Sequence, residues 1–162
     1  LSEEEIRLLK YAAFLHDIGK IEIDRSILNK PGPLDEEEWR ILRQHPLWGS
    51  DIVKSVTKLQ PIASVILYHH ENYDGSGYPE GIRGADIPLL ARIIRIVDSF
   101  DAMTSYRPYR REMSREEAAQ EIERCAGTVF DPVAARLFIE ILQEERNQSV
   151  ETVKKPPACV YR

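Results

Sequence analysis

Repeated helix-start signals restrict the fold of this chain more than any other feature. In a capping box, the first side chain accepts the backbone N–H of a residue three positions later, whose carboxylate accepts the N–H of the first. Three pairs have this spacing, namely Ser2 with Glu5, Asp35 with Glu38, and Ser114 with Glu117. Asp131 followed by Pro132 marks a fourth start. Apolar residues at helical spacing follow each start, so the pattern predicts a helical chain.

Local sequence also predicts where two of these helices end. The N-terminal helix should end near Gly19, which places His16 in its last turn. The helix that begins after Asp35 should end at His45, because Pro46 disfavours helical geometry in the residue before it.

The remaining segments favour one helical domain. Residues 89–105 combine helical length with an apolar face, whereas residues 146–162 show no periodicity and contain two adjacent prolines. No strand pair and no internal repeat is evident in the sequence. We therefore predict an all-α bundle over residues 1–145, followed by an extended C-terminal tail over residues 146–162.

Charge and cysteine content exclude several classes of protein. With 22 Lys+Arg and 27 Asp+Glu, the net charge is −5, so the chain lacks the positive charge that binding of a long nucleic acid requires. No run of about 18 apolar residues could cross a bilayer, and the acidic first residues differ from a secretory signal. Cys125 and Cys159 form no CxxC pair and are expected to be reduced. We expect a cytoplasmic protein with no membrane insertion by this segment.

The chain has four histidines, and all are predicted near helix ends: His16, His45, His69 and His70. Taken singly, each would also fit a histidine that interacts with the dipole at a helix C-terminus. Asp17 follows His16, however, and both continue an apolar helix face, where an ionised carboxylate is costly without a positive partner. A metal ion would supply that charge.

Asp98 raises the same question one turn after Ile94, on a helix that otherwise has the pattern of a core element. An ion pair with an inward-facing Arg or Lys, or rotation to the polar edge of the helix, would also explain it. His69 and His70 are adjacent and diverge by about 100° on an ideal helix, so both reach one ion only if the helix ends there. Imidazole and carboxylate ligands together suit Fe, Mn or Zn better than Ca or Mg.

Four motifs in this order resemble the HD-GYP family, a branch of the HD-domain metal-dependent phosphohydrolases: LHDIGK, HPLWGS, HHENYDGSGYP and RIVDSFDAMTSYRPYR. The similarity extends from Leu8 to about Leu142. It implies an all-α HD-domain bundle with a long GYP loop, and hydrolysis of cyclic di-GMP to pGpG and in some members to GMP. Another cyclic dinucleotide such as cyclic GMP-AMP, or a regulatory module with weak or no turnover, remains an alternative.

The resemblance also implies a two-metal site that holds two divalent transition-metal ions, Fe or Mn. Asp17 corresponds to the carboxylate that bridges both ions. The other ligand positions are His16 and Asp98 on one ion, and His45, His69 and His70 on the other. Hydrolysis would then use a metal-bridging hydroxide, with Asp17 and Lys20 as the catalytic residues. Lys20 matches the family lysine that contacts the substrate phosphate, although an ordinary surface lysine would also fit this position.

Further positions match family residues that hold the nucleotide, namely Tyr78, Arg107 and Arg110. A solvated run of charge would also explain the two arginines. The GYP loop comprises Asp74, Gly75, Gly77, Tyr78 and Pro79. Within the same motif, we expect Glu71 to support the metal ligands and Asp74 to form a turn.

The resemblance further suggests partners and one departure from the family pattern. A GGDEF-type protein, or an upstream receiver or sensor domain, is a possible partner. The family takes an additional metal ligand from a helix upstream of the HD pair, whereas only 15 residues precede His16 in this sequence. The upstream helices of the family pattern are therefore expected to be absent, with lower metal occupancy at the position of His16 and Asp98.

Overall fold

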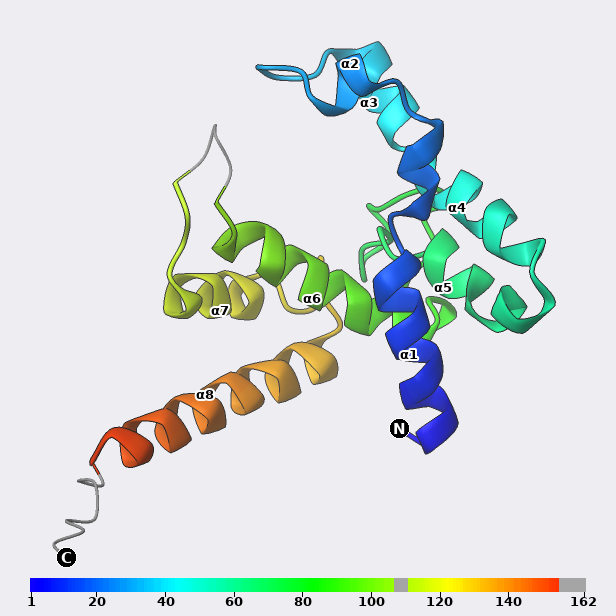
Figure 1. Ribbon diagram of the computed structural model, residues 1–162. Coiled ribbons are helices and arrows are strands. Elements are labelled where there is room, and N and C mark those ends of the chain that lie inside the picture. The colour runs from blue at the N-terminus through cyan, green and yellow to red at the C-terminus, as the bar shows by residue number, and fades with distance from the viewer. Residues whose placement is uncertain (107–110, 155–162) are drawn as a thin grey trace, which may run out of the picture.

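The computed structural model describes residues 1–106 and 111–154, without the side chains of residues 149–154. In these residues the regular elements are all helical, apart from one isolated bridge between Ala126 and Phe130 (Figure 1). The α-helices are α1 (Glu3–Leu15), α2 (Arg25–Leu28), α3 (Glu36–Leu42), α4 (His45–Lys54), α5 (Ala63–Leu67), α6 (Leu89–Thr104), α7 (Arg115–Arg124) and α8 (Pro132–Lys154). Short 3-10 helices are η1 (Ile18–Glu22), η2 (Thr57–Ile62) and η3 (Gly84–Asp86). The predicted all-α fold is confirmed.

The four predicted helix starts are present. Capping boxes formed by both side chains begin α1, α3 and α7. At the start of α8, Oδ1 of Asp131 accepts the backbone N–H groups of Val133 and Ala134 at 2.8 and 3.0 Å. These starts depend on contacts between residues two or three positions apart, which is why local sequence predicts them.

The two predicted helix ends were wrong. Helix α1 ends at Leu15 because Asp17 leaves helical geometry, with φ −96° and ψ 5°, and Gly19 lies in the following 3-10 helix η1. His45 does not end α3 but is the first residue of α4. Pro46 follows in the first turn, where its missing N–H costs no intrahelical hydrogen bond.

The extended tail was also wrong for residues 146–154, because α8 continues as a helix to Lys154. Residues 155–162 lie outside the described part of the chain. Figure 1 shows the C-terminal half of α8 projecting away from the other helices. The described contacts of this part of α8 with α7 are ion pairs, Arg115 with Glu145 and Glu116 with Arg146, which need no apolar face.

Two hydrophobic cores hold the described helices together, and α6 belongs to both. The first core joins α6 to α1, α4 and α5, with Ala12, Ile66 and Ile94 fully or almost fully buried. The second joins the other end of α6 to α7 and α8 around Ile96 and Ile122. Figure 1 shows α6 running from the first group of helices to the second. Within the described residues, no helix is both long and apolar enough to cross a membrane.

A close backbone approach joins η1 to α4, just after the end of α1. A Cβ atom on Gly19 would lie 2.0 Å from the carbonyl oxygen of His45 and 2.5 Å from the amide nitrogen of Gly49. Only glycine fits so close to another backbone. This contact brings Asp17, two residues earlier in the chain, to the start of α4.

Candidate metal centre

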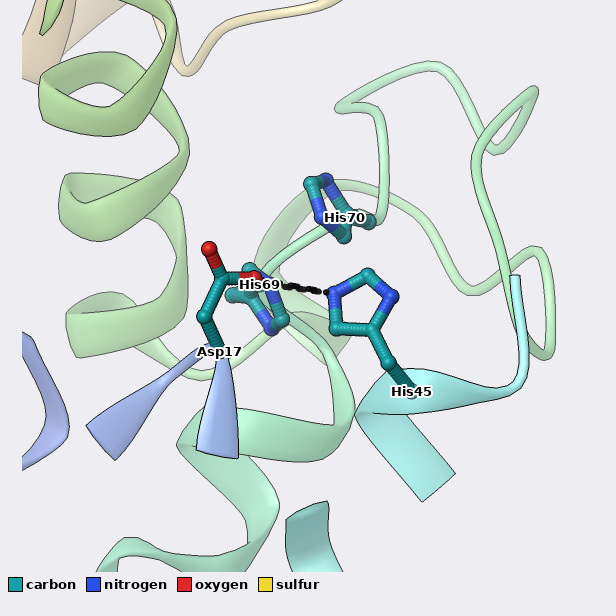
Figure 2. A group of neighbouring side chains, drawn as sticks. All are labelled: Asp17, His45, His69 and His70. Atoms are coloured by element: carbon teal, nitrogen blue, oxygen red, sulfur yellow. Dashed lines mark hydrogen bonds and ion pairs between the residues drawn. The ribbon is translucent and has the colours of Figure 1, made fainter. Parts of the chain in front are cut away.

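Three separate segments bring together four side chains that can bind a metal (Figure 2). Asp17 follows α1, His45 begins α4, and His69 and His70 follow the last turn of α5. One ligand atom from each of the four lies within 4.8 Å of the others. Helix α5 ends at Leu67, so the adjacent imidazoles are free of the 100° divergence of an ideal helix. We refer to these four residues as the four-ligand cluster.

Backbone hydrogen bonds orient the imidazoles of this cluster. Nδ1 of His45 lies 2.7 Å from the carbonyl oxygen of Leu42, and Nδ1 of His69 lies 2.6 Å from that of Ile66. A carbonyl oxygen only accepts, so each Nδ1 carries a proton and each Nε2 is left to bind a metal ion. These two Nε2 atoms are 3.4 Å apart.

Asp17 adds a further acceptor to the same point. Its Oδ1 lies 3.3 Å from Nε2 of His45. This oxygen atom is buried and has no hydrogen-bond partner among the described residues. Burial lowers the pKa of His69 to about 3, and burial also lowers the pKa of His70, so both rings stay neutral at physiological pH. Buried lone pairs that converge without a donor require a cation, so the donor set fits a metal ion.

A second position lies on the other side of Asp17. Nε2 of His16 is 3.5 Å from Oδ2 of Asp17 and 3.7 Å from Oδ1 of Asp98. Nδ1 of His16 donates to the carbonyl oxygen of Ala13 at 2.8 Å, as in the other two rings. Burial disfavours a charged His16, but Asp98 and Asp17 outweigh it and the pKa of His16 is raised. The two oxygens of Asp17 therefore face different histidines.

Lys20 lies directly beside this carboxylate. Its Nζ donates to Oδ2 of Asp17 at 2.6 Å, which leaves the ammonium at the edge of the site. Burial raises the pKa of Asp17, but the neighbouring His45 imidazole and the hydrogen bond and charge of Lys20 have the larger combined effect, so the pKa falls below its usual range. The contact of Lys20 with substrate phosphate stays a prediction. Arg107 and Arg110 lie outside the described residues.

The GYP loop places Tyr78 against the four-ligand cluster. The Tyr78 ring stacks on His70, with centroids 4.9 Å apart and planes 25° apart, and its backbone N–H donates to the carbonyl of His70 at 3.3 Å. Burial raises the pKa of Tyr78 to about 12, so its phenol keeps the proton at neutral pH. Gly77 permits the tight loop, since a Cβ there would lie 2.2 Å from the amide nitrogen of Asn72.

The other loop residues of the motif shape its backbone. Asp74 is exposed, and its Oδ1 accepts the N–H of Ser76 at 2.9 Å, the turn that we expected from it. Gly75 has φ +87°, a conformation that favours glycine. Pro79 follows Tyr78 on the exposed side of the loop.

Glu71 fixes the loop from inside the protein. It is 2% exposed, and its Oε1 accepts the backbone N–H groups of Glu80 and Gly81 at 2.8 and 3.0 Å. Among the described residues, neither oxygen of its carboxylate forms a hydrogen bond with a metal-ligating side chain. Its support of the ligands is therefore indirect, through the loop that carries Tyr78.

Replacing Glu71 with alanine is expected to lower the free energy of unfolding by about 2 kcal/mol, because two backbone donors lose a charged acceptor. Glu71→Gln keeps one acceptor oxygen and should lose less. Urea unfolding followed by circular dichroism measures both. Glu144→Ala, on the exposed surface of α8, is the control and should stay within about 0.5 kcal/mol. Equal losses for Glu71→Ala and Glu144→Ala would contradict the assigned role.

Sequence reasoning missed Arg95, which lies three residues before Asp98 on α6. Its guanidinium donates to Asn72 Oδ1 at 3.0 Å and to Ser99 Oγ at 2.8 Å. Burial lowers its pKa, and the charge of Asp98 opposes that effect. The spacing of three residues from Asp98 on one helix face was the signal that could have found it.

The sequence and fold match known proteins. The HD domain family matches residues 1–133. The chain is 45% identical over 134 residues to "Cyclic di-GMP phosphodiesterase response regulator RpfG" of Xanthomonas campestris. The aligned region covers 82% of this chain and 35% of that protein. The chain is 38% identical over 151 residues to "3'3'-cGAMP-specific phosphodiesterase 3" of Vibrio cholerae, covering 91% and 33%. The chain thus spans about a third of the length of these relatives.

A solved structure shows the same fold. The crystal structure of a cyclic GMP-AMP specific phosphodiesterase of V. cholerae superposes with a TM-score of 0.71 at 24% identity, covering 98% of this chain and 45% of that one. Together with the HDIGK and HHENYDGSGYP motifs and the histidine and aspartate cluster that they form, these matches place the chain in the HD domain family, in its HD-GYP branch.

Proposed function

We propose that this chain is a metal-dependent phosphodiesterase that hydrolyses cyclic di-GMP to pGpG. The observation that carries the proposal is that the buried His45 and His69 and the half-buried Asp17 and His70 each place a ligand atom within 4.8 Å of the others. A relative at 45% identity bears the name of a cyclic di-GMP phosphodiesterase, which supports this choice of substrate.

Two ions, Fe or Mn, form part of the proposal. The four-ligand cluster would hold one ion, and His16 with Asp98 would hold the other. Asp17 would serve both, since its oxygens face different histidines. The second position offers one protein ligand fewer, so we expect its occupancy to be lower. Bound divalent cations supply a more acidic water molecule and neutralise charge on phosphate oxygens.

The protein's own side chains would bind and orient the substrate. The Lys20 ammonium, at the edge of the site, would donate to a phosphate oxygen. The Tyr78 phenol, protonated at neutral pH, would donate a hydrogen bond to the nucleotide. Arg95 lies one turn before Asp98 and adds positive charge beside a site that must hold a phosphodiester anion.

The test is turnover of cyclic di-GMP by protein stripped of metal and then loaded anaerobically with Fe²⁺ or with Mn²⁺. We expect no cleavage without metal and formation of pGpG after loading, measured by liquid chromatography. Whether GMP follows is read from the same traces. Loaded protein that binds the metal but cleaves no cyclic dinucleotide would instead indicate the regulatory module.

A second substrate is supported by one comparison. A relative that is 38% identical bears the name of a 3'3'-cGAMP-specific phosphodiesterase. Equal concentrations of cyclic di-GMP and cyclic GMP-AMP in one assay measure the ratio of their kcat/KM values directly.

A further inference from the structure

A groove lies between α3 and the GYP loop, outside the four-ligand cluster. Its volume is about 430 Å³, within the range of roughly 300–1,000 Å³ for small-molecule sites. Its lining includes two charged residues of α3, Glu36 and Arg40, and also Trp39, Arg43, Gln44, Tyr78 and Pro79. Trp39 is 45% exposed, so a large aromatic face remains open to solvent. This open ring marks the groove as a surface on which a planar ligand can stack.

Arg43 lies between the two aromatic rings of the groove. Its guanidinium carbon is 5.9 Å from the centre of the Trp39 ring and 5.5 Å from that of Tyr78. Among the described residues its side chain forms no hydrogen bond or ion pair, whereas Arg40, one turn earlier, pairs with Glu37 at 2.5 Å. A guanidinium carries five donors in a fixed fork, and those of Arg43 are available to a ligand.

The groove adjoins the metal centre through a shared side chain. Tyr78 forms a wall of the groove and also stacks on His70 of the four-ligand cluster. A ligand whose phosphodiester lies at the cluster would therefore extend its attached nucleoside past Tyr78 toward Trp39. Along this path the ligand would meet first the four-ligand cluster, then the ring of Tyr78, and then Arg43 and the exposed ring of Trp39.

We propose that this groove binds a guanine base of the cyclic dinucleotide, with Trp39 stacking on the base and Arg43 donating to its O6 and N7 atoms. The assignment rests on the proposed function, because the metal centre would hold the phosphodiester of the same ligand. Guanine presents two adjacent acceptors that match an arginine fork. Adenine presents an N6 donor beside N7, which opposes the same donors.

Because the groove would bind a single guanine, it would select substrates by whether they contain at least one. Cyclic di-GMP and cyclic GMP-AMP each carry at least one guanine, so both can enter in the required orientation. Cyclic di-AMP carries none. Arg43 therefore discriminates against cyclic di-AMP more strongly than between the other two.

The experiment compares variants of the metal-loaded chain on three phosphodiesters. These are cyclic di-GMP, cyclic di-AMP and methyl p-nitrophenyl phosphate, which has no purine. We expect Trp39→Ala and Arg43→Ala each to lower kcat/KM for cyclic di-GMP about tenfold or more relative to that for methyl p-nitrophenyl phosphate, mainly through KM. Arg43→Ala should also narrow the preference for cyclic di-GMP over cyclic di-AMP, and Arg43→Lys should restore it only in part.

Matched controls lie away from the groove. Tyr11 is 45% exposed like Trp39, and Arg124 is an exposed arginine paired with Glu121. Tyr11→Ala and Arg124→Ala should leave all three kcat/KM values within about twofold. The proposal is overturned if the groove variants lower hydrolysis of all three substrates equally, or if they behave as the controls do.

Calorimetric binding separates this proposal from the proposed function. If the wild-type chain cleaves no cyclic dinucleotide, the proposed function fails, and titration with guanosine 5'-monophosphate and with ribose 5-phosphate still decides the groove. Binding of guanosine 5'-monophosphate that weakens about tenfold in Trp39→Ala and in Arg43→Ala, but not in the controls, supports the groove. Unchanged binding in both groove variants refutes it.

Discussion

Replacing His69 with alanine is expected to lower the affinity of the four-ligand cluster for Mn²⁺ or Fe²⁺ by more than about 100-fold. Loss of an outer partner of a ligand already costs about 10–100-fold, and His69 would be a ligand itself. The Nε2 atom of His69 lies 3.4 Å from that of His45, and the alanine side chain offers no ligand atom in its place. Metal content after gel filtration, together with a Mn²⁺ titration followed by electron paramagnetic resonance, measures the change.

Two further variants keep this result interpretable. His69→Gln fills most of the same volume, so a variant that binds no metal and retains its helical circular dichroism separates ligand loss from unfolding. His16→Ala acts at the neighbouring position and should leave the ion of the four-ligand cluster in place. Undiminished affinity in both His69 variants would show that this imidazole is no ligand.

Replacing Gly19 with alanine is expected to lower the free energy of unfolding by about 3 kcal/mol or more. The added methyl would lie 2.0 Å from the carbonyl oxygen of His45 and 2.5 Å from the amide nitrogen of Gly49, and neither backbone atom can rotate away. The shift of η1 from α4 should also move Asp17 from His45 and weaken metal binding. Urea unfolding with a chelator present measures the stability alone.

Gly84 provides the matched control for this substitution. It has φ +59°, and a Cβ atom there would meet nothing within 4 Å. Gly84→Ala should therefore cost only about 1 kcal/mol, from backbone conformation. If both alanine variants lost the same stability, close packing of η1 on α4 would not be what requires glycine at position 19.

The parts of this fold that local sequence predicts are those that local contacts determine. The capping boxes of α1, α3 and α7 each involve residues three positions apart, and all three are present. The prediction that His45 ends a helix was wrong, because Pro46 is compatible with the first turn of a new helix as well as with the end of the preceding one. Nothing within a few residues distinguishes these two outcomes.

The candidate site shows the same division. Unusual acids and histidines on apolar segments were visible in the sequence, and the structure brings Asp17, His45, His69 and His70 together. A supporting role was expected for Glu71, but its backbone partners and the position of Arg43 over Trp39 and Tyr78 were not predicted, because tertiary packing supplies them. Glu71 acts on backbone groups nine and ten residues away, and no side-chain pattern encodes such a contact.

Helix α6 is common to both hydrophobic cores, and it also carries Asp98 and Arg95. Packing in both cores holds α6 in place, so loss of packing at one end would disturb the position of the rest of the helix. Loss of packing against α7 and α8 would free the half of α6 that follows Ile96, and Asp98 lies in that half. The integrity of the C-terminal helices is thus a condition for holding one of the proposed metal ligands in register with His16.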